Sequence, residues 1–253
     1  MSGDAQLRDQ VAIVTGGGRG LGRAIALAMA AAGADVALAG RGCEAIEAVA
    51  EEVRALGRRA IAVPTDVTRE EDCEALVART VEELGRVDIL VANSGVLHNG
   101  EVLETAIEDW RRVIDTNLTG TYLCARAAGA RFAAQRSGKV IVIASNWADQ
   151  GVAGFASYCA SKAALVSLTR VLAVEWARLG IQVNAIAPGY FETDINSDVR
   201  ADDELTRRIV KQIPARRMGQ PEELGPLAVY LASAAADFIS GETIVVDGGQ
   251  NAR

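Results

Sequence analysis

Residues 11–22 read VAIVTGGGRGLG and lead into an Ala-rich apolar stretch at residues 23–32. The run of small and β-branched residues predicts a buried strand, and the Ala-rich stretch predicts a helix packed on a sheet. Glycines between such elements allow backbone N–H groups to approach a pyrophosphate, whose charge the helix dipole favours. The spacing is T-G-x-x-x-G-x-G, and no G-K-[ST] follows, which disfavours a P-loop NTPase. The turn therefore indicates a dinucleotide site, with a plain tight turn as the alternative.

The same strand–helix alternation continues along the chain. Further apolar runs predict strands at residues 35–39, 60–63, 87–92, 139–144, 181–186 and 243–246. Helices are expected between and after them, at residues 43–56, 69–84, 110–132, 155–179, 204–211 and 222–232. Continuously apolar strands imply a parallel sheet covered on both faces. We therefore expect an α/β fold in which residues 1–253 form a single domain, a Rossmann-type doubly wound parallel sheet of about seven strands flanked by helices on both faces.

Composition is typical of an ordinary globular protein. Of the 253 residues, 50% are hydrophobic and 23% are charged, which excludes a disordered scaffold. The 33 acidic and 26 basic side chains give a net charge of −7, so nucleic acid and membrane surfaces are disfavoured as partners. The longest apolar run, residues 24–32, is too short to cross a bilayer, and residues 1–4 show no secretory signal. We expect a cytoplasmic protein whose partner is a small molecule.

Cysteine and histidine are too sparse to suggest a metal site. Cys43, Cys73, Cys124 and Cys159 form no CxxC pair, so we expect small buried side chains in a reducing compartment. With His98 as the single histidine, we predict no zinc site and no bound metal. A Ser-His-Asp triad would also have to use His98, and no G-x-S-x-G motif accompanies it.

Two arginines bear on which dinucleotide would bind. An acidic residue at the end of the second strand would accept a hydrogen bond from the ribose 2′-OH of NAD, whereas an arginine would pair with a 2′-phosphate. The chain has Gly40-Arg41 at this position and Arg19 in the glycine-rich turn. Since guanidinium groups suit phosphate oxygens, the sequence predicts NADP as the cofactor, with NAD possible. The alternative is that both arginines are ordinary surface charges.

Tyr158 and Lys162 form a second chemical signal. Four residues apart on a predicted helix, they share one face. A nearby ammonium and the positive charge of an oxidised nicotinamide would lower the pKa of a phenol, which could then exchange a proton with a substrate oxygen. Ser145 ends a predicted strand, where side chains face the ligand crevice. Asn117 lies in a predicted helix despite its poor propensity, which suggests a specific contact, with a surface position as the alternative.

In their order and spacing these motifs resemble the short-chain dehydrogenase/reductase family. They are Thr15-Gly16-x-x-x-Gly20-x-Gly22, Asp66-Val67, Asn93-Ser94-Gly95, Asn117, Ser145, Tyr158-x-x-x-Lys162, Pro188-Gly189 and Val246-Asp247-Gly248-Gly249. The likeness spans about residues 11–249. There are two departures from the family pattern: residues 92–95 read A-N-S-G where N-N-A-G is usual, and Ala144 precedes the serine. Neither removes a reacting group.

The resemblance implies roles for these residues. Tyr158 would be the general acid/base, Lys162 would bind the nicotinamide ribose and lower the tyrosine pKa, Ser145 would polarise the substrate carbonyl, and Asn117 would hold a water in a proton relay. Asp66 would contact the adenine, Asn93 would support the nicotinamide side, and Thr193 would reach the carboxamide. The implied cofactor-binding set is Gly16, Gly18, Arg19, Gly20, Leu21, Arg41, Asp66, Val67, Asn93, Ser94, Gly95, Tyr158, Lys162, Pro188, Gly189 and Thr193.

Substrate choice is expected to depend on residues 98–102, 146–155 and 190–211. Polar side chains in and beside these segments suit a sugar acid or polyol; the predicted substrate contacts are Ser145, Asn146, Gln150 and Tyr190, and further candidates are His98, Glu192 and Asn196. For His98 an ordinary loop position is an equal alternative. Residues 187–193 and 213–217 resemble those of gluconate 5-dehydrogenases and, less closely, 3-oxoacyl-carrier-protein reductases.

These observations lead to three hypotheses about the function. The first is an NADP(H)-dependent oxidoreductase that interconverts a secondary alcohol and a ketone on a small polar substrate. The second is a reductase of 3-oxoacyl thioesters, and the third is a cofactor-bound sensor or scaffold, since a fold does not dictate function. A scaffold would be expected to lose the tyrosine or the lysine, and both are present. The resemblance also implies a homotetramer formed through the long helices at residues 110–132 and 155–179 and the C-terminal segment.

Overall fold

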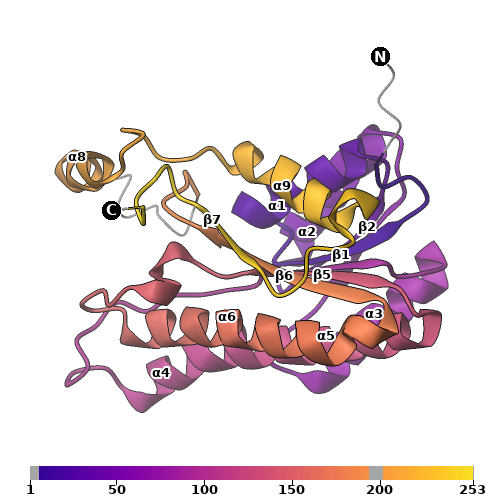
Figure 1. Cartoon of the computed structure of the whole chain (residues 1–253), viewed down its shortest axis with the longest axis horizontal. Coiled ribbons are helices and arrows are strands. Elements are labelled where there is room, and N and C mark those ends of the chain that lie inside the picture. Colours follow the sequence, from indigo (N-terminus) through magenta and orange to yellow (C-terminus); the bar gives the residue numbers. More distant parts are fainter. Residues whose placement is uncertain (1–5, 194–201, 253) are drawn as a thin grey trace.

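The strands pair into one seven-stranded parallel sheet (Figure 1) in the order β3-β2-β1-β4-β5-β6-β7. The structure is a computed structural model, and it describes residues 6–193 and 202–252. The strands are β1 (Val11–Thr15), β2 (Asp35–Gly40), β3 (Ala60–Pro64), β4 (Ile89–Ala92), β5 (Gly138–Ile143), β6 (Ile181–Pro188) and β7 (Thr243–Val246). The predicted α/β fold with about seven parallel strands is confirmed.

Helices cover both faces of this sheet, as the continuously apolar strands require. One face packs against α1 (Gly20–Ala31), α2 (Cys43–Ala55) and α9 (Gly225–Ala232). The other packs against α3 (Glu70–Leu84), α5 (Gly120–Gln135) and α6 (Ala156–Trp176). Neighbouring residues of one strand enter opposite cores: Ile13 belongs to the α3–α5–α6 core, and Val14 belongs to the α1–α2–α9 core. In the described part of the chain, none of the helices is long and apolar enough to cross a membrane.

Several elements differ from the predicted ones in their ends or their geometry. The helix expected at residues 110–132 is α4 (Ile107–Ile114), a π-helical turn (Asp115–Thr119) and then α5. The last expected helix begins as a 3₁₀ turn (Pro221–Leu224) before α9, and α6 ends in another (Ala177–Leu179). The helix expected at residues 204–211 is α8 (Asp203–Gln212), which packs on a small separate core that includes Ile209 and Met218.

The order of the strands determines where a ligand can lie. From β1 the chain passes to β2 and β3 on one side, and then returns to place β4 to β7 on the other. The helices that follow β1 and β4 therefore diverge, which opens a crevice at the carboxyl ends of these two strands. The glycine-rich turn follows β1, so it lies at this crevice.

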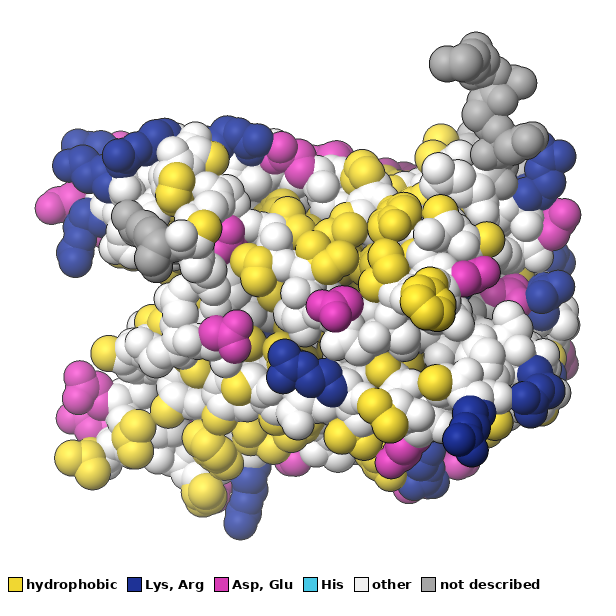
Figure 2. Space-filling model, viewed as in Figure 1, with side chains coloured by type: hydrophobic (Ala, Val, Ile, Leu, Met, Phe, Trp, Pro, Cys, Tyr) yellow, Lys and Arg dark blue, Asp and Glu magenta, His cyan; other side chains and the backbone are white. Residues whose placement is uncertain are grey.

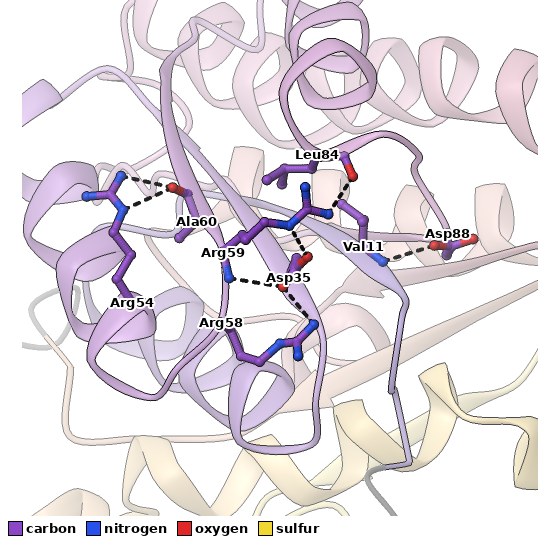
Figure 3. A network of polar contacts seen from close by, with 8 residues as sticks. All are labelled: Val11, Asp35, Arg54, Arg58, Arg59, Ala60, Leu84 and Asp88. Atoms are coloured by element: carbon purple, nitrogen blue, oxygen red, sulfur yellow. Dashed lines mark hydrogen bonds and ion pairs between the residues drawn. The ribbon is translucent and has the colours of Figure 1, made fainter.

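The amino ends of the strands are held by carboxylates (Figure 3). Asp35, at the start of β2, accepts hydrogen bonds from Arg59 Nε at 2.7 Å and from the Arg59 N–H at 3.0 Å, and it pairs with Arg58 Nη2 at 2.8 Å. Asp88 accepts a hydrogen bond from the N–H of Val11 at 2.9 Å. This network lies at the end of the sheet opposite the crevice.

Candidate active site

A cleft of about 750 Å³ runs along the carboxyl ends of the strands. The space-filling view is hollowed beside the lobe that carries α8 (Figure 2). The cleft is lined by every residue of the predicted cofactor-binding set, and also by Ser145, Asn146 and Tyr190 from the predicted substrate set. Two predicted site residues, Asn117 and Gln150, do not line it. The structure thus brings together residues that are spread from the first strand to the loop after the sixth.

The glycine-rich turn forms a floor that leaves no room for side chains. A Cβ on Gly22 would lie 2.2 Å from the carbonyl oxygen of Gly16, and Gly16 itself has a φ of +62°. α1 begins at Gly20 with no side-chain cap, so the N–H groups of its first turn remain available to a ligand. A backbone cradle at the amino end of a twelve-residue helix fits a pyrophosphate group.

Asn93 ties this turn to β4. Its Nδ2 donates to the carbonyl oxygens of Thr15 at 2.9 Å and Gly16 at 3.1 Å, and its backbone N–H donates to Thr15 Oγ1 at 3.0 Å. The N–H of Ser94 donates to the same hydroxyl at 3.1 Å. These bonds join the end of β4 to the glycine-rich turn after β1, and the predicted role of Asn93 on the nicotinamide side stays a prediction.

A positive group lies where the second strand ends. Arg41 directly follows β2, is exposed, and lines the cleft together with Arg19 from the glycine-rich turn. The pKa of Asp66 is lowered, first by a hydrogen bond from the N–H of Thr68 and further by the charge of Arg41. Arg41 is therefore near enough to act on Asp66, and both side chains lie at the same end of the cleft.

Tyr158, Lys162 and Ser145 converge in the middle of the cleft. Ser145 follows β5, while Tyr158 and Lys162 lie in the first turns of α6. Lys162 is 4% exposed, and its Nζ donates to the carbonyl oxygen of Ile143 at 2.7 Å. The same Nζ lies 5.6 Å from the centre of the Tyr158 ring, and the Ser145 side chain is hydrogen-bonded to the Tyr158 phenol.

Burial dominates the titration of this pair. It raises the pKa of Tyr158 to about 12, although the hydrogen bond with Ser145 acts in the opposite direction. Burial also lowers the pKa of Lys162 to about 8. The lowered phenol pKa predicted from the sequence is thus not produced by these protein groups alone, because burial of the phenol outweighs the hydrogen bond with Ser145.

Asn117 is buried behind the cleft, in the π-helical turn before α5. Its Oδ1 accepts a hydrogen bond from the N–H of Val96 at 2.8 Å, and its Nδ2 donates to the carbonyl oxygen of Val96 at 2.9 Å and to Ser161 Oγ at 3.0 Å. The specific contact inferred from its poor helix propensity is therefore present. It joins the loop after β4 to α6, and the predicted role in holding a water stays a prediction.

Trp147, which the sequence did not single out, lines the cleft and packs among other aromatic side chains. The Trp147 ring lies 4.9 Å from Phe155, 5.8 Å from Tyr158 and 5.8 Å from Tyr190, measured between ring centres. The signal was the position of Trp147, two residues after Ser145 in a segment already assigned to the substrate. Burial raises the pKa of Tyr190 above its ordinary value.

The other substrate candidates lie outside the cleft or outside the described residues. His98 Nδ1 lies 3.6 Å from Asp109 Oδ1 and does not line the cleft, which favours the ordinary loop position. Gln150 hydrogen-bonds instead to Asn251, near the end of the chain. Glu192 is exposed and does not line the cleft, and Asn196 lies outside the described residues.

The expectation that all four cysteines are buried is wrong for two of them. Cys73 and Cys124 are buried, with their sulfurs 3.5 Å apart between α3 and α5. Cys43 is exposed and Cys159 is partly exposed. Cys43 is the first residue of α2, and Cys159 lies in α6 next to Tyr158; neither position is fully covered by the rest of the protein.

The chain is similar to known proteins over nearly its whole length. A family model described as Enoyl-(Acyl carrier protein) reductase matches residues 16–251. The chain is 42% identical over 251 residues to the 2-dehydro-3-deoxy-D-gluconate 5-dehydrogenase of Escherichia coli (strain K12), covering 98% of this chain and 97% of that protein. It is 40% identical over 245 residues to a 3-oxoacyl-[acyl-carrier-protein] reductase of Synechocystis sp., covering 96% and 97%.

A solved structure shares the whole fold. A gluconate 5-dehydrogenase from Burkholderia cenocepacia J2315, crystallised in complex with NADP and tartrate, superposes with a TM-score of 0.95 at 35% identity, covering 99% of this chain and 98% of that one. The chain belongs to the short-chain dehydrogenase/reductase family.

Proposed function

We propose that the protein is an NADP(H)-dependent oxidoreductase that interconverts a secondary alcohol and a ketone. The observation that carries this proposal is the convergence of Ser145, Tyr158 and Lys162 in a cleft whose floor is a glycine cradle. NADP(H) would supply the hydride, and the protein would supply position and proton transfer. The sensor or scaffold alternative is disfavoured because the tyrosine and the lysine are both in the cleft.

The hydroxyls of Ser145 and Tyr158 would hold the reacting oxygen of the substrate. Both side chains line the cleft and are hydrogen-bonded to each other, so one oxygen could contact both. They would stabilise the negative charge that develops on that oxygen when a ketone is reduced. Tyr158 would donate its proton to the oxygen and would accept a proton in the reverse direction. Lys162 would bind the ribose hydroxyls and stabilise the phenolate.

NADP fits the adenosine end of the cleft better than NAD does. Arg19 and Arg41 both line this end, and guanidinium groups pair well with a 2′-phosphate. The gluconate 5-dehydrogenase of known structure was crystallised with NADP, which supports the same assignment. Asp66 and Thr193, which also line the cleft, would bind the adenine and the carboxamide.

A sugar acid is the substrate class that the cleft supports best. Asn146 provides a polar amide next to Ser145, and relatives with 35–42% identity act on gluconate-type acids. A 3-oxoacyl thioester remains the second candidate because one relative is a 3-oxoacyl-[acyl-carrier-protein] reductase at 40% identity. Aromatic rings of Trp147 and Tyr190 could pack against either kind of substrate.

A substrate panel with both cofactors tests the activity. Sugar acids, polyols and 3-oxoacyl thioesters would be assayed by absorbance of the reduced nicotinamide, with NADP(H) and NAD(H) in parallel. Tyr158→Phe should lower kcat by about 10³-fold, because the proton donor is lost, while the Kd for NADPH stays nearly unchanged. Tyr122→Phe, on the exposed side of α5, is the control. Substantial turnover by Tyr158→Phe would contradict the mechanism.

We also propose that the protein forms a homotetramer and is located in the cytoplasm. Large apolar side chains are exposed on α6, on α9 and along β7, and Figure 2 shows hydrophobic side chains gathered over the face where α9 and β7 lie. A face of this kind on a protein is typical of an interface between subunits. The cytoplasmic location rests on the sequence features alone.

A further inference from the structure

The segment after β7 folds back onto the wall of the cleft beside Ser145. The carboxylate of Asp247 accepts hydrogen bonds from the backbone N–H groups of Gly249 at 2.9 Å, Gln250 at 3.1 Å and Asn251 at 2.8 Å. These bonds turn the chain sharply. The turn directs the side chains of Gln250 and Asn251 towards residues 146–150, and we call residues 247–252 the return segment.

Amide groups join the return segment to the cleft wall. Asn146 Nδ2 donates to Gln250 Oε1 at 3.0 Å and lies 3.4 Å from Asn251 Oδ1. Asn251 Nδ2 donates to the carbonyl oxygen of Asn146 at 2.8 Å, and Gln150 Nε2 donates to Asn251 Oδ1. Asn251 therefore contacts Asn146, which is next to Ser145 and begins the 3₁₀ turn (Asn146–Asp149), and Gln150, which follows the turn.

The return segment is itself fixed on two further sides. The carbonyl oxygen of Gly248 accepts a hydrogen bond from the N–H of Ala215 at 3.1 Å, which ties it to the chain that follows α8. The N–H of Gly189 donates to the carbonyl oxygen of Val246 at 2.9 Å, and a Cβ on Gly189 would lie 2.6 Å from Asp247 Cβ. The segment is thus packed between the α8 region and the Pro188-Gly189 turn.

These contacts determine how Asn146 meets the cleft. The side chain is 3% exposed and lines the cleft, while its amide nitrogen is engaged by Gln250 and Asn251. Since the nitrogen is engaged by the return segment, the amide oxygen would be the atom that meets a ligand. An amide oxygen accepts hydrogen bonds and does not donate them, so it suits a substrate hydroxyl and not a carboxylate.

We propose that Gln250 and Asn251 are positioning residues that determine substrate specificity. They hold the Asn146 amide so that its oxygen accepts a hydrogen bond from a hydroxyl on a carbon next to the reacting carbon of a polyhydroxylated acid. The proposal rests on the function proposed above, whose substrate class it narrows. It concerns the choice between hydroxylated and deoxygenated substrates and leaves the proton transfer at Tyr158 unchanged.

The test compares substrates that differ by one hydroxyl. Asn251→Ala and Gln250→Ala would be assayed with saturating NADP⁺ on D-gluconate and on the two deoxy analogues that each lack one hydroxyl flanking the reacting carbon. Gln182→Ala, at the amino end of β6 and far from the cleft, is the control. Asn251→Ala should raise the KM for gluconate about tenfold and leave the KM for one analogue, the KM for NADP⁺ and kcat within roughly twofold. Gln250→Ala should show the same pattern with a smaller change.

Loss of the preference for the hydroxylated substrate supports the proposal. An equal rise of KM for all substrates, or an unchanged preference in both variants, overturns it. If Asn251→Ala fails to bind NADPH and so is not folded, Gln250→Ala carries the same comparison.

Hydrogen exchange separates this proposal from the proposed function. Without substrate, the N–H of Trp147 donates to Ser145 Oγ and the N–H of Gln150 donates to the carbonyl oxygen of Trp147. Both N–H groups should exchange faster in Asn251→Ala than in the wild type. Unchanged exchange at these two sites overturns the positioning role. Absence of wild-type turnover on gluconate and related acids would instead reject the substrate class, and the exchange measurement would still decide the role of Asn251.

Discussion

Lys162 places a titratable amine in a nearly closed wall of the cleft. Burial lowers its pKa from 10.5 to about 8, so between these pH values the unfolded chain binds a proton that the folded protein has released. The free energy of unfolding contributed by this group therefore rises as pH rises from 8 to 10.5, by about 3 kcal/mol. Lys162→Met should remove this rise. Urea unfolding of the cofactor-free protein at several pH values measures it.

Lys211→Met, on the exposed side of α8, gives the baseline for that series. Other buried groups add their own pH dependence, among them Tyr190, whose pKa is raised by burial. They are present in both proteins, so the difference between wild type and Lys162→Met isolates the lysine. A difference that stays constant from pH 7 to 10.5 would show that Lys162 titrates normally in the folded protein.

Arg41 is the residue on which the cofactor preference is expected to depend. Arg41→Asp would place a carboxylate beside the 2′-position, where it would repel a phosphate and accept a hydrogen bond from a hydroxyl. Since charge-assisted hydrogen bonds contribute about 1.5–3 kcal/mol, the KM for NADP⁺ should rise at least about tenfold while the KM for NAD⁺ falls. Steady-state kinetics with the two cofactors at a fixed substrate concentration measures both values.

Arg69→Asp is a matched control for this change. Arg69 also lowers the pKa of Asp66 by its charge, but it does not line the cleft. An effect of general surface charge would appear in both variants, whereas a phosphate contact would appear only in Arg41→Asp. If the ratio of the two cofactor KM values is unchanged in Arg41→Asp, the NADP assignment fails.

The sequence indicated the residues of the cleft more completely than the contacts that hold them. Gly16, Tyr158 and Lys162 were found because short local spacings limit which residues can face one ligand. The partners of Asn146 were missed because Gln250 is 104 positions away and no local pattern connects the two. Burial of the Tyr158 phenol was missed for a similar reason: it is set by side chains from several elements, among them Trp147 and Tyr190.

At the scale of elements, contacts at the amino ends of the strands stabilise the folded protein and lie away from the cleft. The side chain of Asp35 is 7% exposed and joins β2 to the two arginines that precede β3 (Figure 3). Asp35→Asn would leave two guanidinium groups without their carboxylate, so the free energy of unfolding should fall by about 2 kcal/mol. Urea denaturation measures the loss, and kcat should be unchanged because the cleft is at the other end of the sheet.

Asp237→Asn provides the comparison, since Asp237 pairs with Lys139 at 2.6 Å but is 65% exposed. Exposed ion pairs contribute about 0–1 kcal/mol, so this variant should lose less stability than Asp35→Asn. Equal losses in the two variants would mean that burial of Asp35 adds nothing to its ion pairs.

The elements that the sequence placed well are those with a continuous apolar pattern. β1 and β2 begin where the runs that start at residues 11 and 35 predict, because burial on both faces selects small and β-branched residues. The π-helical turn at Asp115–Thr119 was not predicted; Asn117 within it contacts Val96 and Ser161, which lie outside this helix and which no local pattern connects to it. The periodicity of apolar residues predicts which face of a helix is buried, but it does not predict where an α-helix contains a π-helical turn.

For the whole molecule, several large apolar side chains are exposed on and around β7. β7 is an edge strand, and Val245 on it is 41% exposed. Val171 on α6 and Tyr230 on α9 are exposed to a similar degree, and Val174 on α6 and Phe238 before β7 are still more exposed. We call these five residues the β7 patch. Covering it removes apolar surface from water, with about 1.5–3 kcal/mol gained for each fully buried side chain. A closed assembly of identical subunits would cover the patch once on each copy.

The β7 patch makes the proposed homotetramer testable by charge. Val174→Glu and Phe238→Glu each place a carboxylate in the patch, and near a twofold axis that carboxylate would face its own copy, so burial and repulsion both oppose association. Sedimentation velocity should show a tetramer for the wild type and smaller species for both variants. Leu56→Glu changes an equally large exposed side chain at the end of α2, outside the patch, and should remain tetrameric. A monomeric wild type would reject the tetramer, whereas tetrameric Val174→Glu and Phe238→Glu would place its interface elsewhere than the β7 patch.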